Sequence, residues 1–325
     1  MALQFLLLIA GLLLILLGAN WLVDGSSSIA KKTGLSEFVI GLTIVGIGTS
    51  TPEMVVSFIS SFQGKADMAI GNIVGSNIFN TLIILGITAV ILPLAISKET
   101  IRRDLPLNLL ATALLIGLGM KHSIFGAGTD TLTRIDGLIL LSLLAWYFWI
   151  LLRKPKNAAV EDAGPSKEEE DSIKVFSTGK SLILIAAGLG GLVFGGRLFV
   201  DSATEIAVHY HMSQKFIAIT IMAAGTSLPE LATCVVAALK GRSQLALGNV
   251  LGSNIFNILL ILGGSALIHP LKFGAMTPVD VGTMMISAIF LILSVYTFKK
   301  NKLDKFEGAI LLLMEAGYMT WLFMN

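Results

Sequence analysis

Long apolar runs, separated by short polar stretches, cover almost the whole chain. Each run is long enough to cross the hydrocarbon core of a bilayer as an α-helix. We place the predicted spans at residues 3–23, 38–62, 68–94, 105–120, 135–152, 180–200, 214–239, 243–268, 279–298 and 307–324. The pattern therefore predicts an all-α integral membrane protein with ten transmembrane helices.

The longest polar stretch, residues 154–178, mixes charged residues with Gly, Pro and Ser. We interpret it as a solvated linker between two halves of the chain, residues 1–153 and 179–325. The alternative is an ion-sensing loop around the acidic run "EEED" at residues 168–171.

Composition agrees with a membrane protein, since 54% of the 325 residues are hydrophobic and only 14% are charged. No sizeable soluble domain remains, and we expect no nucleic-acid partner. Of the 23 Lys and Arg residues, seventeen fall in or beside the loops after spans 1, 3, 5, 7 and 9, and six fall on the other face. The positive-inside rule makes the first face cytoplasmic. Both termini are then outside, the linker is cytoplasmic, and a cell (inner) membrane location is expected.

The first run, residues 3–23, lacks a basic leader and a small-residue cleavage site. It is also too long for the core of a signal peptide, so we interpret it as a retained span.

The chain contains the same pattern twice. With a shift of 177 residues, 21 of 46 positions are identical between Gly41–Gly86 and Ala218–Gly263. With a shift of 171, "RIDGLILL" at 134–141 matches "KFEGAILL" at 305–312. Each half therefore holds five spans, and because five is odd the second half must enter the membrane inverted. Inverted repeats of this kind are typical of secondary transporters, whose binding site lies near the midplane where the repeats meet.

The first repeated motif is "GTSTPE", which returns as "GTSLPE". It places an ionisable acid, Glu53 or Glu230, inside an apolar run, where a carboxylate costs at least about 2.5–3.5 kcal/mol. The proline before each acid removes a backbone donor, so a broken helix with exposed carbonyl oxygens is expected. Hydroxyl oxygens in the same turns come from Thr49, Ser50, Thr226 and Ser227.

The second motif is "GNIVGSNIFN", which returns as "GNVLGSNIFN". Three neutral oxygen donors recur every four residues and share one helical face. They are Asn72, Ser76 and Asn80 in the first half, and Asn249, Ser253 and Asn257 in the second. His, Cys and Met do not accompany them in these motifs, so the donor set suits hard cations such as Ca²⁺ or Na⁺. Small-residue helix packing is the alternative interpretation, but packing alone needs no buried glutamate.

The segments that hold these motifs, residues 41–86 and 218–263, resemble the alpha repeats of the Ca²⁺/cation antiporter superfamily. Prokaryotic inner-membrane calcium/sodium antiporters look closest. The resemblance implies that Glu53 and Glu230 are carboxylates shared by Ca²⁺ and Na⁺. It implies a central Asn80, flanking Na⁺ sites lined by Ser76 and Ser253, and further oxygens from Thr49, Thr226, Ser50, Ser227 and the carbonyls of Gly46 and Ala223.

One position departs from the sodium-coupled pattern. Well-known sodium-coupled relatives have aspartate where this chain has Asn257, and proton-coupled relatives often lack that acid too. Two hypotheses therefore stand: Ca²⁺/Na⁺ exchange by alternating access, with Ca²⁺ extrusion, and proton/calcium exchange through the same carboxylates. A cation channel is a weaker third, because inverted halves with broken helices favour alternating access.

An enzyme is not expected, since an intramembrane hydrolase needs a serine with a nearby base and no span centre holds that pair. No cofactor is expected beyond the transported Ca²⁺ and Na⁺ or H⁺, and the sequence gives no oligomeric state. For three further features we expect a structural role and no part in transport. Cys234 is expected to be a buried bystander, Glu315 a structural acid, and the aligned Asp24 and Asp201 interfacial residues.

Overall fold

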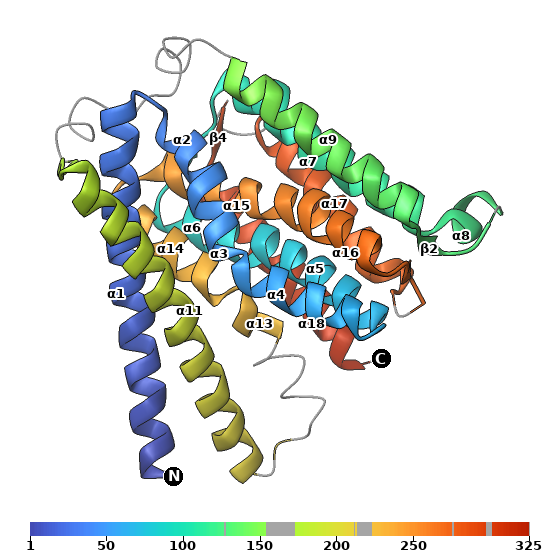
Figure 1. The fold of residues 1–325 in the computed structure, drawn as a ribbon, viewed down its shortest axis with the longest axis horizontal. Coiled ribbons are helices and arrows are strands. Elements are labelled where there is room, and N and C mark those ends of the chain that lie inside the picture. The colour runs from blue at the N-terminus through green and yellow to red at the C-terminus, as the bar shows by residue number, and fades with distance from the viewer. Residues whose placement is uncertain are drawn as a thin grey trace. The chain divides into compact units, whose positions relative to one another are not determined.

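The computed structural model describes residues 1–126, 128–153, 173–210, 212, 223–274, 276–296 and 301–324. Most of these residues are helical (Figure 1). The α-helices are α1 (Ala2–Thr33), α2 (Glu37–Ile40), α3 (Gly46–Thr49), α4 (Thr51–Phe62), α5 (Ala66–Phe79), α6 (Leu85–Ile91), α7 (Leu105–Gly119), α8 (Lys121–Phe125), α9 (Arg134–Arg153), α11 (Thr178–His209), α13 (Ala223–Thr226), α14 (Leu228–Leu239), α15 (Ser243–Phe256), α16 (Gly263–Ile268), α17 (Pro278–Ser294) and α18 (Lys305–Met324). The π-helical segments are η1 (Gly41–Val45), η2 (Asn80–Ile84), η3 (Thr100–Asp104) and η5 (Asn257–Leu262). The strands are β1 (Leu94–Ala95), β2 (Thr131–Leu132), β3 (Leu271–Lys272) and β4 (Lys302–Leu303).

Within the described ranges, six helices are long and apolar enough to cross a membrane, and a bent pair makes a seventh candidate. Two further apolar helices, α14 and α17, are shorter. Residues 213–222, before α13, and residues 297–300, after α17, are outside the described residues. Each of the ten predicted spans contains helix in its described part. The helical membrane class is thus confirmed, and the count of ten spans remains a prediction.

The described chain forms two compact units. Unit 1 comprises Met1–Pro52 and Pro165–Val250, and unit 2 comprises Glu53–Gly164 and Leu251–Asn325. Each unit contains segments from both predicted halves.

The most extensive helix packing in unit 1 is between α1 and α11, which lie side by side (Figure 1). Glycines on α1 recur every seven residues and meet the backbone of α11. A Cβ on Gly11 would lie 2.7 Å from the Phe199 nitrogen, and one on Gly18 would lie 2.7 Å from the Gly188 oxygen. Gly25 lies against Ser181. As residue numbers increase along α1, the residues they contact on α11 decrease in number. These two equivalent helices therefore run antiparallel, as an inverted repeat requires.

Both long helices extend well beyond their predicted ends at residues 23 and 200. The predicted ends fall where polar residues begin, but on α1 the segment after Asp24 has buried small side chains, including Ser26, Ser27 and Ser28. A hydroxyl of this segment is bonded to the other helix, since Ser181 Oγ donates to Ser28 Oγ at 2.9 Å. Packing and hydrogen bonding therefore carry the helix through a polar sequence.

The predicted linker, residues 154–178, lies outside the described residues up to residue 172. Its last part meets α1, because the Phe176 backbone N–H donates to Ser28 Oγ at 2.9 Å.

Unit 2 repeats its own contacts. Strand β1 pairs with β4 through Leu94 and Leu303, and β3 pairs with β2 through Leu271 and Leu132. Shifts of 177 and 171 residues convert the first pairing into the second. The same shifts relate two close glycine contacts, Gly86 with Gly308 and Gly263 with Gly137. The repeat seen in the sequence is therefore a repeat of tertiary contacts in this unit.

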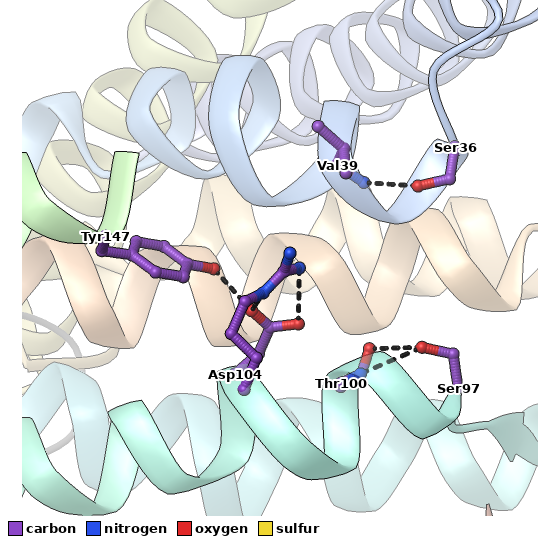
Figure 2. Close-up of polar contacts among 7 residues, drawn as sticks. Ser36, Val39, Ser97, Thr100, Asp104 and Tyr147 are labelled. Atoms are coloured by element: carbon purple, nitrogen blue, oxygen red, sulfur yellow. Dashed lines mark hydrogen bonds and ion pairs between the residues drawn. The ribbon is translucent and has the colours of Figure 1, made fainter. Parts of the chain in front are cut away.

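A buried carboxylate and tyrosine also occur twice in unit 2. The Tyr147 hydroxyl donates to Asp104 Oδ1 at 2.7 Å (Figure 2). The Tyr318 hydroxyl donates to Asp280 Oδ1 at 2.8 Å. The partners differ, because the Arg103 guanidinium pairs with Asp104, whereas Asp280 forms a capping box with Thr277 at the start of α17. Each pair ties the last helix of one half to the unit.

Candidate functional site

Two helix breaks occur at equivalent positions. Helix α3 ends at Thr49, and Ser50 (φ −79°, ψ 9°) separates it from α4. Helix α13 ends at Thr226, and Ser227 (φ −89°, ψ 7°) separates it from α14. The first break bends the span by 47°. The breaks predicted from the two proline motifs are therefore present, each centred on the serine.

The two acids follow the breaks directly. Glu53 and Glu230 lie in the first turns of α4 and α14, and both have 0% exposure. Free backbone N–H groups and the helix dipole at a helix start favour negative charge. The prolines at the second position of each helix remove only an N–H that would have no partner within the helix. Each break thus builds a buried environment that favours a carboxylate.

In unit 1, hydroxyls from the first break bond to acceptors of the second half. Ser50 Oγ donates to Glu230 Oε1 at 2.9 Å. Thr49 Oγ1 donates to Asn249 Oδ1 at 3.0 Å and lies 3.5 Å from the carbonyl oxygen of Gly46. The structure therefore brings four of the residues singled out in the sequence, Thr49, Ser50, Glu230 and Asn249, into one buried cluster.

In unit 2, the other acid is reached from the second motif of its own half. Ser76 Oγ donates to Glu53 Oε1 at 3.4 Å. Asn72 Nδ2 donates to the Glu53 carbonyl at 3.2 Å and to Ser57 Oγ at 3.0 Å. The serine and asparagine, four residues apart on α5, thus hold both the side chain and the backbone of Glu53.

The asparagines of the second motif meet in unit 2. Asn77 Nδ2 donates to the Asn254 carbonyl at 3.1 Å, and Asn254 Nδ2 donates to Thr81 Oγ1 at 2.9 Å. Asn257 Nδ2 donates to Asn77 Oδ1 at 3.0 Å. Asn80 and Asn257 each begin a π-helical segment, η2 and η5. Such segments are frequent at functional sites.

All twelve residues predicted for the site lie in described parts of the chain. Unit 1 holds Gly46, Thr49, Ser50, Ala223, Thr226, Ser227 and Glu230. Unit 2 holds Glu53, Ser76, Asn80, Ser253 and Asn257. Ser227 and Ser253 are fully buried, and Ala223 begins α13.

Sequence reasoning assigned no role to Ser57, Cys234, Asn77 or Asn254. A signal for the asparagines existed, because they are identical under the 177-residue shift. Cys234 is buried as predicted, and it accepts a hydrogen bond from Asn249 that the sequence did not predict. Asp24 bonds to Lys240 at 2.6 Å, so this residue is an ion-pair partner that links α1 to the end of α14.

Within the described part of the chain, no three His, Cys, Asp or Glu side chains form a group that could hold a metal ion. A cation bound at these motifs would therefore depend on hydroxyl, amide and carbonyl oxygens in addition to the glutamates. Such ligands are typical of hard cations.

Comparison with known proteins gives one family. Residues 3–153 and 180–324 match the family described as "Sodium/calcium exchanger protein". "Putative antiporter CaxA" of Alkalimonas amylolytica is 37% identical over 317 residues, covering 97% of each chain. "Sodium/calcium exchanger MaX1" of Methanosarcina acetivorans is 32% identical over 347 residues, covering 98% of each. A solved structure of the sodium-calcium exchanger NCX_Mj matches with a TM-score of 0.81 at 32% identity, covering 98% of each chain. These matches cover nearly the whole chain and confirm the resemblance of the two motifs, and the chain therefore belongs to the sodium/calcium exchanger family.

Proposed function

We propose that this protein is a secondary active antiporter that exchanges Ca²⁺ for Na⁺ by alternating access and extrudes Ca²⁺ from the cytoplasm. Its ten spans form two inverted five-helix repeats in the cell membrane, with both termini outside. Family membership supports this proposal, as do the antiparallel course of the equivalent helices α1 and α11 and the repeated contacts of unit 2.

One observation carries the proposal. Each of two equivalent helix breaks is followed by a fully buried glutamate that accepts a hydrogen bond from a serine hydroxyl. Burying two carboxylates costs several kcal/mol each unless the charge is compensated. A transported cation supplies that compensation, so the acids are best explained as cargo ligands.

Exchange follows from the charge of the two glutamates. Glu53 and Glu230 supply two negative charges, which one Ca²⁺ balances. Ca²⁺ and Na⁺ compete for these carboxylates, and the protein changes access only when the charge is balanced by one or the other. A protein without bound cations keeps two buried carboxylates with no cargo ion and does not change access, so transport of one ion requires countertransport of the other.

The neutral ligands come from the breaks and from the asparagine motif. We assign oxygens of Thr49, Ser50, Thr226 and Ser227, the carbonyls of Gly46 and Ala223, and the side chains of Ser76, Ser253, Asn80 and Asn257. Support comes from the asparagines. Among the described residues, Asn80 Oδ1 and Asn257 Oδ1 are buried and have no hydrogen-bond partner. A buried acceptor of this kind is costly unless a ligand uses it.

A second candidate is proton/calcium exchange, which one observation favours. Asn257 is a neutral amide tethered to Asn77, so this position adds no third carboxylate for Na⁺. Glu53 and Glu230 would then exchange protons for Ca²⁺.

The experiment is ⁴⁵Ca²⁺ uptake into proteoliposomes. Uptake is driven first by an outward Na⁺ gradient with pH clamped, and then by a pH gradient without Na⁺. Uptake in the first condition alone supports sodium coupling, and uptake in the second alone supports proton coupling. No uptake in either condition would contradict the antiporter.

Two variants test the site in the same assay. Glu53→Gln and Glu230→Gln each remove one negative charge while keeping the shape of the side chain. Each is expected to lower uptake at least about 100-fold, because one of the two carboxylates that balance the charge of Ca²⁺ is lost. Asp67→Asn, at an exposed position of α5, is the matched control and should transport normally. Retained transport in both glutamine variants would overturn the site assignment.

A further inference from the structure

Cys234 takes part in two of three linked hydrogen bonds, which form a chain in unit 1. Thr49 Oγ1 donates to Asn249 Oδ1 at 3.0 Å, and Asn249 Nδ2 donates to Cys234 Sγ at 3.2 Å. The Cys234 thiol donates to the Ala246 carbonyl at 3.6 Å. The side chains of Thr49, Cys234 and Asn249 are in residues with 0% exposure. Solvent is thus excluded from the chain.

The direction of this chain is fixed from its far end. The Ala246 carbonyl can only accept, so the thiol proton points toward it. The sulfur then presents its lone pairs to Asn249, which must turn its NH₂ group toward Cys234. The amide oxygen of Asn249 therefore faces Thr49, and the threonine hydroxyl must donate.

This direction matters for the threonine oxygen. When the Thr49 proton is committed to Asn249, the lone pairs of Oγ1 remain available to a cation. Without that acceptor, the hydroxyl can donate to the Gly46 carbonyl, 3.5 Å away within the same helix. That bond would occupy a second oxygen that we assign to the cation. A rotated Asn249 would present N–H groups where an acceptor is needed.

We propose that Asn249 and Cys234 are positioning residues for cation binding, which set the proton of Thr49 so that its oxygen acts as a ligand. This inference rests on the proposed function. Asn249 acts through Thr49, and Cys234 acts through Asn249.

The first half has the related bond, with a serine hydroxyl in place of the thiol. Ser57 stands at the position of Cys234, and Asn72 stands at the position of Asn249. Asn72 gives its NH₂ group both to Ser57 and to the Glu53 carbonyl. Two bonds to α4 orient the Asn72 amide. A thiol at this position occurs in the second half alone, because Cys234 is the single cysteine of the chain.

The test measures initial ⁴⁵Ca²⁺ transport against Ca²⁺ concentration in proteoliposomes. Cys234→Val keeps the bulk and removes both donor and acceptor. Loss of one neutral hydrogen bond predicts a rise of about threefold to tenfold in half-saturating Ca²⁺, with the maximal rate within about twofold of normal. Cys234→Ser keeps a donor and acceptor, and should restore the half-saturating concentration to within about twofold of the wild type. Cys234→Ala provides the same test if the valine variant does not fold.

A double variant separates positioning from packing. Thr49→Val removes the oxygen that the chain orients, so Cys234→Val added to it should raise half-saturating Ca²⁺ no further. Additive effects, or a serine variant as impaired as valine, would show that Cys234 acts only by packing and would overturn the proposal.

The two proposals can fail separately. If Glu230→Gln is inactive while Cys234→Val and Cys234→Ala keep the wild-type half-saturating Ca²⁺, the positioning role is wrong and the antiporter stands. If Glu230→Gln transports normally, the carboxylate site is wrong and the role given to Thr49 falls with it.

Discussion

Asn80 and Asn257 occupy equivalent places, each at the start of a π-helical segment, yet their hydrogen bonds differ. Asn257 is tethered through Nδ2 to Asn77. Neither side-chain atom of Asn80 has a hydrogen-bond partner among the described residues. Within the described part of the chain, both retain an amide oxygen with no hydrogen bond.

The difference has a local cause. Thr81 follows Asn80, and its hydroxyl accepts from Asn254 Nδ2. Ile258 follows Asn257 and offers no acceptor, so Asn77 Nδ2 bonds instead to the Asn254 carbonyl. We infer that this difference, Thr81 against Ile258, makes two near-identical motifs bond differently. The two near-identical motifs place equivalent amide oxygens, but among the described residues a hydrogen bond orients the amide of Asn257 and none orients that of Asn80.

The largest effect is expected from a charge at these two positions. Asn257→Asp places a carboxylate against the Asn77 oxygen, and should destabilise the cation-free protein by about 3–5 kcal/mol. Asn80→Asp breaks no hydrogen bond and should cost about 1–3 kcal/mol less. Unfolding in detergent, measured with and without Ca²⁺, gives both values, and Ca²⁺ should restore most of the loss.

The same pair of aspartate variants tests coupling. Asn257→Asp adds an acid at the position where sodium-coupled relatives have one, so the ratio of Na⁺-driven to pH-driven uptake should rise. An unchanged ratio would show that this position does not set the coupling ion. Equal losses of unfolding free energy in the two variants would show that the hydrogen bond from Asn257 to Asn77 does not contribute to stability.

A smaller effect should separate the two alanine variants. Asn257→Ala leaves a buried oxygen of Asn77 without its donor, and should cost about 1–3 kcal/mol of stability. Asn80→Ala removes no hydrogen bond, so its stability loss should be under about 1 kcal/mol, while half-saturating Ca²⁺ rises because an oxygen ligand is lost. The reverse order of stabilities would contradict the comparison.

The smallest effect is expected at the threonine that causes the asymmetry. Thr81→Val removes the acceptor for Asn254 at constant shape and should cost about 0.5–1.5 kcal/mol, whereas Thr81→Ser should be close to neutral. In the Thr81→Val background, the stability gap between Asn80→Ala and Asn257→Ala should narrow. A gap of unchanged size would show that Thr81 is not its cause.

The sequence predicted features that depend on local pattern. Hydrophobic runs located the helices, and the proline motifs located the breaks at Ser50 and Ser227. The repeat also identified the acids, because a duplicated Glu53 inside an apolar run needs a reason beyond packing.

Partners contributed by distant segments could not be predicted. The bond from Asn77 to Asn254 joins residues 177 apart, and the sequence does not say which of several buried amides will meet. The role of Cys234 depends on Asn249 and Ala246, which lie on another helix. Burial of Ser26–Ser28 extended α1 because α11 lies against it, which hydropathy alone does not record.

The spacing of small residues on α1 and α11 is compatible with more than one alignment of the two helices along their axes. Small residues recur every seven positions on both helices, at Gly11, Gly18 and Gly25 on one and Ser181, Gly188 and Gly195 on the other. A slip of seven residues, about 10.5 Å, would bring small residues opposite small residues again. The small-residue contacts in the middle of the pair therefore do not determine by themselves how far one helix is shifted along the other. Polar bonds near the two ends, Gln4 with Glu205 and Ser28 with Ser181, select one alignment.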